Sequence, residues 1–344
     1  MTTNLEKHID MDPDHIKTTQ ETASEDVYLG IDIGGTNTKI GLVRSNGDIV
    51  VMSVFPTQAH LSFAEFVENL TTQVNNKLLS NCQGQHIKGI GVGAPNANYW
   101  NGRIEKASNL SWGTIDVVSA LNKKYNIPVA ITNDANAAAM GEKYFGAAKN
   151  MENFILLTLG TGLGSGIMLN GSIIYGAGGH AGEIGHMVVD SNGRVCGCGR
   201  RGCLETYVSA PGIRRTVFEL ISEYTEPSKL RYISFSDLRA EDITNAADEG
   251  DQIALKAFER TGRILGMKLA DVVALVNPEA IILAGGLAQA GKYILEPVQM
   301  HLEANLLSIF RGKTKIMISD LMEGSLAVLG ASAMIMQQIN RDLD

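Results

Sequence analysis

The feature that most constrains the fold of this chain is a strand–turn–strand unit that occurs twice. Near the start, the strand-like run VYLGIDI (27–33) leads into the turn GGTN (34–37), after which KIGLV resumes an extended pattern. About 127 residues later, FILLTLG, TGLG and SGIML follow the same plan. This repeat predicts a duplicated lobe whose two glycine-rich turns face each other across a phosphate-binding cleft.

The rest of the sequence alternates strand and helix patterns, which is typical of α/β lobes. Strands are predicted at 49–54, 88–93, 129–132, 280–286 and 315–319, and helices at 62–80, 206–224, 251–276 and 324–339. A chain of 344 residues is long enough for two lobes of roughly 150 residues each. We expect 26–134 with 323–344 to form a smaller lobe, 135–322 to form a larger lobe, and 1–25 to be a disordered leader.

The charge and the hydrophobic pattern argue against two classes of partner. A net charge of −8 is unsuited to a surface that neutralises nucleic-acid phosphates. The first 25 residues are polar and lack the apolar core of a signal peptide, so we expect a cytoplasmic protein. The most apolar stretch, 269–287, is interrupted by polar residues and proline and cannot cross a membrane as one apolar helix.

The first glycine-rich turn, 32–39, has the composition of an anion-binding turn. Its backbone N–H groups are unhindered at the glycines, and neighbouring side chains add further donors: Gly34, Gly35, Thr36, Asn37 and Lys39. Asp32, at the end of the strand, is suited to hold Mg²⁺ through water. The alternative is a glycine β-turn that binds nothing.

The second turn, 159–166, has the same anion-binding composition, with Gly160, Thr161 and Gly162. Its GxGxG core also resembles a dinucleotide-binding fingerprint, but such a loop opens directly into a helix, whereas here SGIML resumes a strand pattern. A third glycine pair, Gly285 and Gly286, ends a buried strand and suits an adenine or ribose packed against backbone. We therefore expect all three segments to bind ATP.

Asp134 follows a predicted strand and precedes the small-residue helix ANAAAMGEKYFG. In that position an aspartate is often an N-cap, because its side chain accepts a hydrogen bond from the first turn of the helix. Between two phosphate-binding turns, the same carboxylate is also well placed to accept a proton from an attacking hydroxyl. Both roles are compatible only if the side chain turns outward into the cleft.

Three of the four cysteines lie in CGCGRRGC (196–203), shortly after the motif HAGEIGH (180–186). One histidine and three thiolates, His186, Cys196, Cys198 and Cys203, make a complete tetrahedral zinc set, which predicts a structural metal in the larger lobe. The alternative is a turn of reduced thiols without a ligand. Glu183 and Glu205 flank the cluster and suit hydrogen bonds from sugar hydroxyls, unless they are solvated surface groups.

The ordered motifs DIGGTNTKIG, NDANAAAMGE, LTLGTGLGSGI, HAGEIGH, CGCGRRGCLE and AGG resemble those of the ROK (repressor, open reading frame, kinase) family, from about Val27 to the C-terminus. The resemblance implies a two-lobed actin-like ATPase fold of the ribonuclease H-like type. It implies that Asp134 is the general base and that the histidine and the three cysteines bind zinc. It also implies that the sugar is held by a set of polar side chains: Asn109, Asn133, Asp134, Glu183, His186 and Glu205.

The ROK family contains sugar kinases and transcriptional repressors. This chain is expected to be an ATP-dependent hexose 6-kinase, because Asp134 and the first turn are intact and a 25-residue leader is too short for a winged-helix DNA-binding domain. Glucose is the expected substrate on family frequency, with N-acetylglucosamine, N-acetylmannosamine or a broader hexose range as alternatives. The resemblance implies ATP with Mg²⁺ and a homodimer or homotetramer, and it leaves polyphosphate open as a donor.

Overall fold

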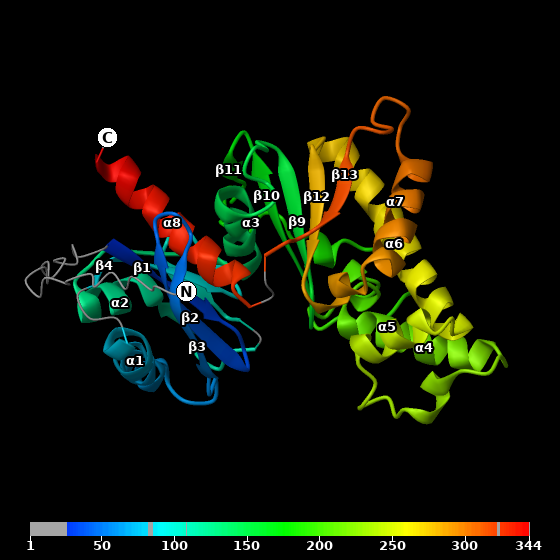
Figure 1. Ribbon diagram of the computed structural model, residues 1–344, viewed down its shortest axis with the longest axis horizontal. Helices are drawn as coiled ribbons and strands as arrows, with labels where there is room; N and C mark the ends of the chain where they lie inside the picture. The colour runs from blue at the N-terminus through cyan, green and yellow to red at the C-terminus, as the bar shows by residue number, and fades with distance from the viewer. Residues whose placement is uncertain (1–25, 82–84, 108, 322–323, 344) are drawn as a thin grey trace, which may run out of the picture.

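The computed structural model describes residues 26–81, 85–107, 109–321 and 324–343, so the predicted leader at 1–25 lies outside the described residues. Two five-stranded sheets lie side by side (Figure 1). The first has the order β3-β2-β1-β4-β8. Its strands are β1 (Asp26–Ile33), β2 (Asn37–Arg44), β3 (Ile49–Pro56), β4 (His86–Ala94) and β8 (Val129–Asn133).

The second sheet has the order β11-β10-β9-β12-β13 and repeats the first strand by strand. Its strands are β9 (Phe154–Leu159), β10 (Leu163–Leu169), β11 (Ser172–Ile173), β12 (Ala280–Ala284) and β13 (Lys315–Ile318). In both sheets the hairpin is antiparallel, and the next two strands add in parallel to its first strand. The duplication that the two hairpins predicted is confirmed, and so is the α/β class.

Each sheet is covered by helices. The first carries α1 (Phe63–Gln73) and α2 (Val117–Tyr125), and the second carries α4 (Ala210–Glu223), α5 (Ala240–Asp248), α6 (Gln252–Val276) and α7 (Lys292–Asn305). The amphipathic pattern explains this placement, because one face of each helix reaches a buried core. Within the described ranges, no helix is both long and apolar enough to cross a membrane.

Two helices lie where the lobes meet. The chain leaves the second sheet after β13 and returns to the first sheet as α8 (Leu326–Leu343), which packs on β1, on β4 and on α3 (Asp134–Phe145). Glycine is required beneath α8, since a Cβ at Gly91 would collide with the carbonyl oxygen of Ala331. This crossing supports our proposal that 323–344 belongs with the smaller lobe.

Two of the differences between the fold and the sequence prediction lie in the first lobe. The helix predicted at 62–80 starts at Phe63 behind a capping box of Ser62 and Glu65, but it is α-helical only to Gln73 and continues as a π-helical turn, Val74–Leu78. A three-stranded sheet of β5 (Ala97–Asn98), β6 (Arg103–Glu105) and β7 (Thr114–Asp116) was not predicted. Strands of two or three residues are too short to show alternation.

Candidate active site

A cavity of about 170 Å³ lies where the carboxyl ends of the two sheets meet. The first lobe contributes Asp32, Lys39 and Asp134 to its walls, and the second contributes Thr158, Gly285 and Ser319, among others. The two sets occupy corresponding places, because Asp32 and Thr158 lie on the first hairpin strands while Asp134 and Ser319 directly follow the last strands. The predicted cleft between the two turns is therefore present.

Asp32 lies on β1 opposite Lys39 on β2, and its Oδ2 is 3.7 Å from the lysine Nζ. Burial raises the pKa of Asp32 to about 6; Lys39 opposes the rise and Asp134 adds to it. Two carboxylates that face one cavity beside a lysine ammonium group are a donor set that fits Mg²⁺, which prefers few carboxylates and keeps its waters. These residues therefore fit the predicted metal–nucleotide site.

The first turn is held in a defined shape by backbone and hydroxyl hydrogen bonds. The N–H of Gly34 donates to the carbonyl of Asn37 at 3.0 Å, and Thr57 Oγ1 donates to the carbonyl of Gly34 at 2.6 Å. Gly35 lies against Asn109, since a Cβ on Gly35 would come 2.9 Å from the Cβ of that asparagine. Thr36 and Asn37 are exposed at the tip. The turn thus presents donors while touching one predicted sugar ligand.

The second turn is closed by a hydrogen bond from the N–H of Gly160 to the carbonyl of Gly162 at 3.0 Å. Glu205 lies against it and accepts from the N–H of Leu163 through Oε2 at 3.0 Å. A side chain at Gly162 would meet that oxygen at 2.5 Å, which explains why glycine stands there. Thr161 is exposed at the tip. The second predicted phosphate turn and a predicted sugar carboxylate are therefore in direct contact.

The third glycine pair lies at the same end of the second sheet. Gly285 has φ +89°, and a Cβ there would come 2.8 Å from the carbonyl oxygen of Leu159, so only glycine fits beside the second turn. Gly286 begins a short 3₁₀ helix, Gly286–Ala290. The pair lies beside the cavity, as the adenine or ribose prediction requires.

Asp134 is the first residue of α3, and the structure assigns the N-cap to its neighbour. Asn133 Oδ1 accepts from the N–H of Ala135 at 2.9 Å, and Asp134 Oδ1 shares the same donor at 2.9 Å. Among the described residues, no side chain makes a hydrogen bond to this carboxylate. The residue has exposed surface in the cleft, yet the protein that surrounds its carboxylate raises its pKa. This is the geometry expected of a proton acceptor that also supports a helix end.

Three of the predicted sugar residues form one electrostatic group with Asp134. Burial raises the pKa of Glu183; His186 opposes the rise, whereas Asp134 and Glu205 add to it. Groups that influence one another in this way lie close together. Glu183 directly precedes the short 3₁₀ helix Ile184–His186, and Glu205 lies within another, Leu204–Thr206. These four groups lie within electrostatic reach of one another, and their role in sugar binding stays a prediction.

The predicted zinc ligands converge. One ligand atom from each of His186, Cys196, Cys198 and Cys203 lies within 4.8 Å of all the others, His186 Nδ1 is 3.7 Å from Cys196 Sγ, and the sulfurs of Cys198 and Cys203 are 3.6 Å apart. Gly202, at φ +70°, lets the loop pass against the carbonyl of Asp190. One nitrogen and three sulfurs at these separations fit a tetrahedral zinc ion.

The zinc ligands touch the residues that face the cleft. The thiol of Cys196 donates to Glu205 Oε1 at 3.6 Å, and the Arg200 guanidinium donates to the carbonyl of His186 at 2.6 Å. A metal at this position would therefore hold Glu205 and His186 in place from behind, as outer partners of a metal site commonly do.

Three polar side chains of the second lobe line the cavity and were not predicted from the sequence. These are Thr158, Ser319 and Gln289. A signal for Thr158 was present, because aligning the two hairpins places it opposite Asp32. No comparable signal existed for Ser319 or Gln289, since neither belongs to a glycine-rich turn.

Comparison with known proteins agrees with this geometry. A family model described as the ROK family matches residues 28–338. A glucokinase of Halalkalibacterium halodurans is 36% identical over 317 residues, which cover 91% of this chain and 96% of that protein. A xylose repressor of Bacillus subtilis is 34% identical over 247 residues, covering 72% of this chain and 60% of the repressor.

Among solved structures, a ROK family glucokinase from Streptomyces griseus, in complex with glucose and AMPPNP, superposes with a TM-score of 0.77 at 28% identity. The match covers 90% of this chain and 99% of that one. The two-lobed fold that the motifs predicted is thereby confirmed.

Proposed function

The chain belongs to the ROK family, and on that premise we propose that it is an ATP-dependent hexose kinase that phosphorylates the 6-hydroxyl of glucose. The observation that carries this function is Asp134, which lines a cavity bordered by both glycine-rich hairpins and whose carboxylate is not paired with any described side chain. A base beside two phosphate-binding turns is the arrangement that phosphoryl transfer to a hydroxyl requires.

In this function the sugar lies against Asn109, Glu183, His186 and Glu205, which accept and donate hydrogen bonds to its hydroxyl groups. Asp134 then accepts the proton of the primary hydroxyl as the hydroxyl oxygen bonds to the γ-phosphorus, and the bond from the γ-phosphorus to the β–γ bridging oxygen breaks so that ADP leaves. Backbone N–H groups of the two turns, with Lys39, bind the phosphate oxygens. Mg²⁺, held near Asp32, supplies neutralisation of the phosphate charge when bound.

The zinc ion in this proposal is structural. All four positions of a tetrahedral ion are filled by the protein, so the metal would order the loop that carries Glu183 and Glu205 rather than take part in the transfer. We also propose a cytoplasmic homodimer or homotetramer without nucleic-acid partners. Large apolar side chains exposed on α6, on α7 and after it support self-association: Leu275, Met300, Leu307 and Ile309.

The experiment that tests the function is a coupled ADP-release assay with glucose, mannose, fructose, N-acetylglucosamine and N-acetylmannosamine. Glucose should give the highest kcat/KM with ATP. If kcat/KM for an N-acetylated sugar exceeds that for glucose tenfold, the chain is an N-acetylhexosamine kinase with the same mechanism. Replacing ATP by polyphosphate tests the donor. If none of the sugars is phosphorylated and the chain binds DNA tightly at physiological salt, the repressor class would be favoured instead.

A further inference from the structure

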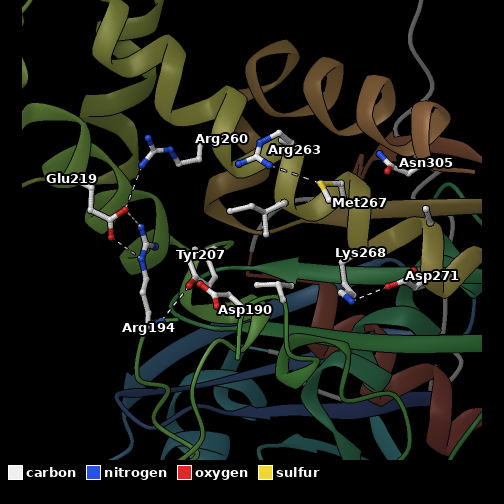
Figure 2. A pocket seen from close by; sticks show the side chains of 13 residues that line it. Asp190, Arg194, Tyr207, Glu219, Arg260, Arg263, Met267, Lys268, Asp271 and Asn305 are labelled. Carbon is white, nitrogen blue, oxygen red and sulfur yellow. Dashed lines mark hydrogen bonds and ion pairs between the residues drawn. The ribbon is translucent and has the colours of Figure 1, made fainter. Parts of the chain in front are cut away.

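A second cavity, of about 540 Å³, opens on the larger lobe and shares no lining residue with the catalytic cavity. It lies between the loop that carries Asp190, Arg194 and the three clustered cysteines, on one side, and helices α4 and α6 on the other (Figure 2). Its volume is within the range of pockets that hold small ligands, roughly 300–1,000 Å³. The proposed kinase reaction does not use this cavity.

Most charges around the cavity neutralise one another. Arg194 makes two hydrogen bonds to Glu219, at 3.0 and 2.7 Å, and Arg260 approaches Glu219 at 3.5 Å. At the other end, Lys268 pairs with Asp271 at 2.7 Å. Figure 2 shows Arg194 and Arg260 both pointing toward Glu219 and Lys268 lying beside Asp271. These pairs shape the walls and leave little net charge.

Two charged groups in the cavity have no opposite charge as a partner within the described part of the chain. The guanidinium of Arg263 makes a hydrogen bond to the sulfur of Met267, at 3.9 Å, and no ion pair with a described residue. Asp190 accepts a backbone hydrogen bond from Asn192 at 3.0 Å and is not in an ion pair. Asn305 donates to the carbonyl of His301 at 2.7 Å, which leaves its own oxygen open. The cavity thus offers an unmatched cation together with unmatched acceptors.

We propose that this cavity binds a small phosphorylated sugar, with the phosphate at Arg263 and the ring hydroxyls at Asp190 and Asn305. A guanidinium matches a phosphate in charge and geometry, and carboxylate and amide oxygens accept from hydroxyl groups. Ile264 and Met267 supply apolar surface for the carbon face of the ring. A free phosphate ion would satisfy Arg263 but would leave the acceptors and most of the volume unused.

The cavity is connected to the catalytic cleft through its wall. Arg194 donates through Nη1 to the carbonyl of Thr206 at 2.7 Å and through its backbone N–H to the hydroxyl of Tyr207 at 3.2 Å. Glu205, which lies against the second glycine-rich turn, directly precedes these residues. Because Arg194 and Tyr207 line the cavity, a bound ligand lies against the segment that holds Glu205, and we expect it to change the KM for the hexose; this consequence rests on the proposed function.

Calorimetric titration of the full chain tests the site. Glucose is titrated first, which tests the proposed substrate independently. Glucose 1-phosphate is then added with glucose saturating, so that the catalytic cleft is occupied, and inorganic phosphate and glutamate are titrated in parallel. We expect one glucose 1-phosphate per chain, an affinity at least tenfold weaker for phosphate, and at least tenfold weakening of glucose 1-phosphate binding in both Arg263→Ala and Asp190→Asn. Arg103→Ala, an exposed arginine on the small lobe, is the matched control and should bind normally.

Several outcomes would overturn the proposal. Absence of glucose 1-phosphate binding to the wild-type chain is one, and unchanged binding in both variants is another. Equal affinity for phosphate would reduce the site to a simple anion site, and preferential binding of glutamate would assign it to an amino acid. A change of oligomeric state in Arg263→Ala, without ligand binding to the wild type, would make the cavity an interface between copies of the chain.

Discussion

The two sheets have the same strand order, yet they bring different chemistry to the cleft. At the hairpin position the first lobe has Asp32 and the second has Thr158, and after the last strand the first has Asp134 and the second has Ser319. The first lobe therefore supplies both carboxylates, whereas the second supplies hydroxyls and glycines. A duplicated fold can build one asymmetric site, because phosphate binding needs both turns but proton transfer and metal binding need carboxylates on one side only.

The lobes also differ in the segment that connects the edge strand to the next helix. In the first lobe, β3 is separated from α1 by residues 57–62, whereas in the second the longer segment 174–209 separates β11 from α4. That segment contains the cysteine cluster and both glutamates that we propose to hold the sugar. The carboxylates that we propose for the second lobe thus come from an insertion rather than from the duplicated sheet, and an insertion with only short 3₁₀ turns benefits from a metal.

The largest effect is expected from Asp134→Asn. The amide retains shape and an acceptor for the N–H of Ala135, but it cannot take the proton, so kcat should fall by about 10²-fold or more. The melting temperature should change little. At the corresponding place in the second lobe, Ser319→Ala should mainly lower the melting temperature, because Ser319 donates to the buried Glu142. Near wild-type turnover by Asp134→Asn would end the general-base assignment.

The second largest effect is expected from Asp32→Asn, which should lower kcat/KM for Mg·ATP by about 10- to 100-fold. In the wild type, kcat/KM should fall as the pH drops through about 6, because Asp32 must be ionised to attract the metal, and this acidic limb should be absent from the variant. An unchanged pH profile in Asp32→Asn would show that another group titrates.

Asp32→Asn should lower activity but raise the stability of the fold above the pKa of Asp32. Burial raises the pKa of Asp32 above its unfolded value of 3.8, so its contribution to stability is complete below pH 3.8 and is lost as the pH rises through about 6. Asp32→Asn should therefore melt at a higher temperature than the wild type at pH 8, and this advantage should shrink toward pH 4. Thermal unfolding at several pH values measures both.

A third effect concerns the inserted loop. Metal analysis should find one zinc per chain, and Cys198→Ser should lose it while the KM for the hexose rises about tenfold and the KM for ATP changes less. Cys82→Ser, a cysteine outside the cluster, is the control and should keep its zinc. A wild-type chain purified without chelators that contains no zinc would contradict the structural metal.

Features of the fold and the candidate site that depend on neighbouring residues could be predicted from the sequence, whereas features that depend on distant segments could not. The hairpins, the cysteine cluster and the position of Asp134 follow from local patterns, in which the residues that act together are close in the sequence. Ser319 and the contact between Gly35 and Asn109 depend on how distant segments pack, and no local pattern encodes them. The cap at α3 was predicted for Asp134 and belongs to Asn133, because the helix begins at Asp134 itself, directly after a strand that runs to Asn133.

The smallest effect is expected from Thr158→Val, which removes the hydroxyl that takes the place of Asp32 in the second lobe. If that hydroxyl contributes one neutral hydrogen bond to a phosphate, its loss is worth about 1 kcal/mol, or roughly fivefold in kcat/KM for ATP. Valine keeps the volume and suits a strand, so the melting temperature should stay within a degree or two. Initial rates at varied ATP decide the matter. A decrease in kcat/KM for ATP as large as that of Asp32→Asn would mean that the second turn stabilises the phosphate charge as much as the first. The two lobes would then differ only in that the first supplies the general base.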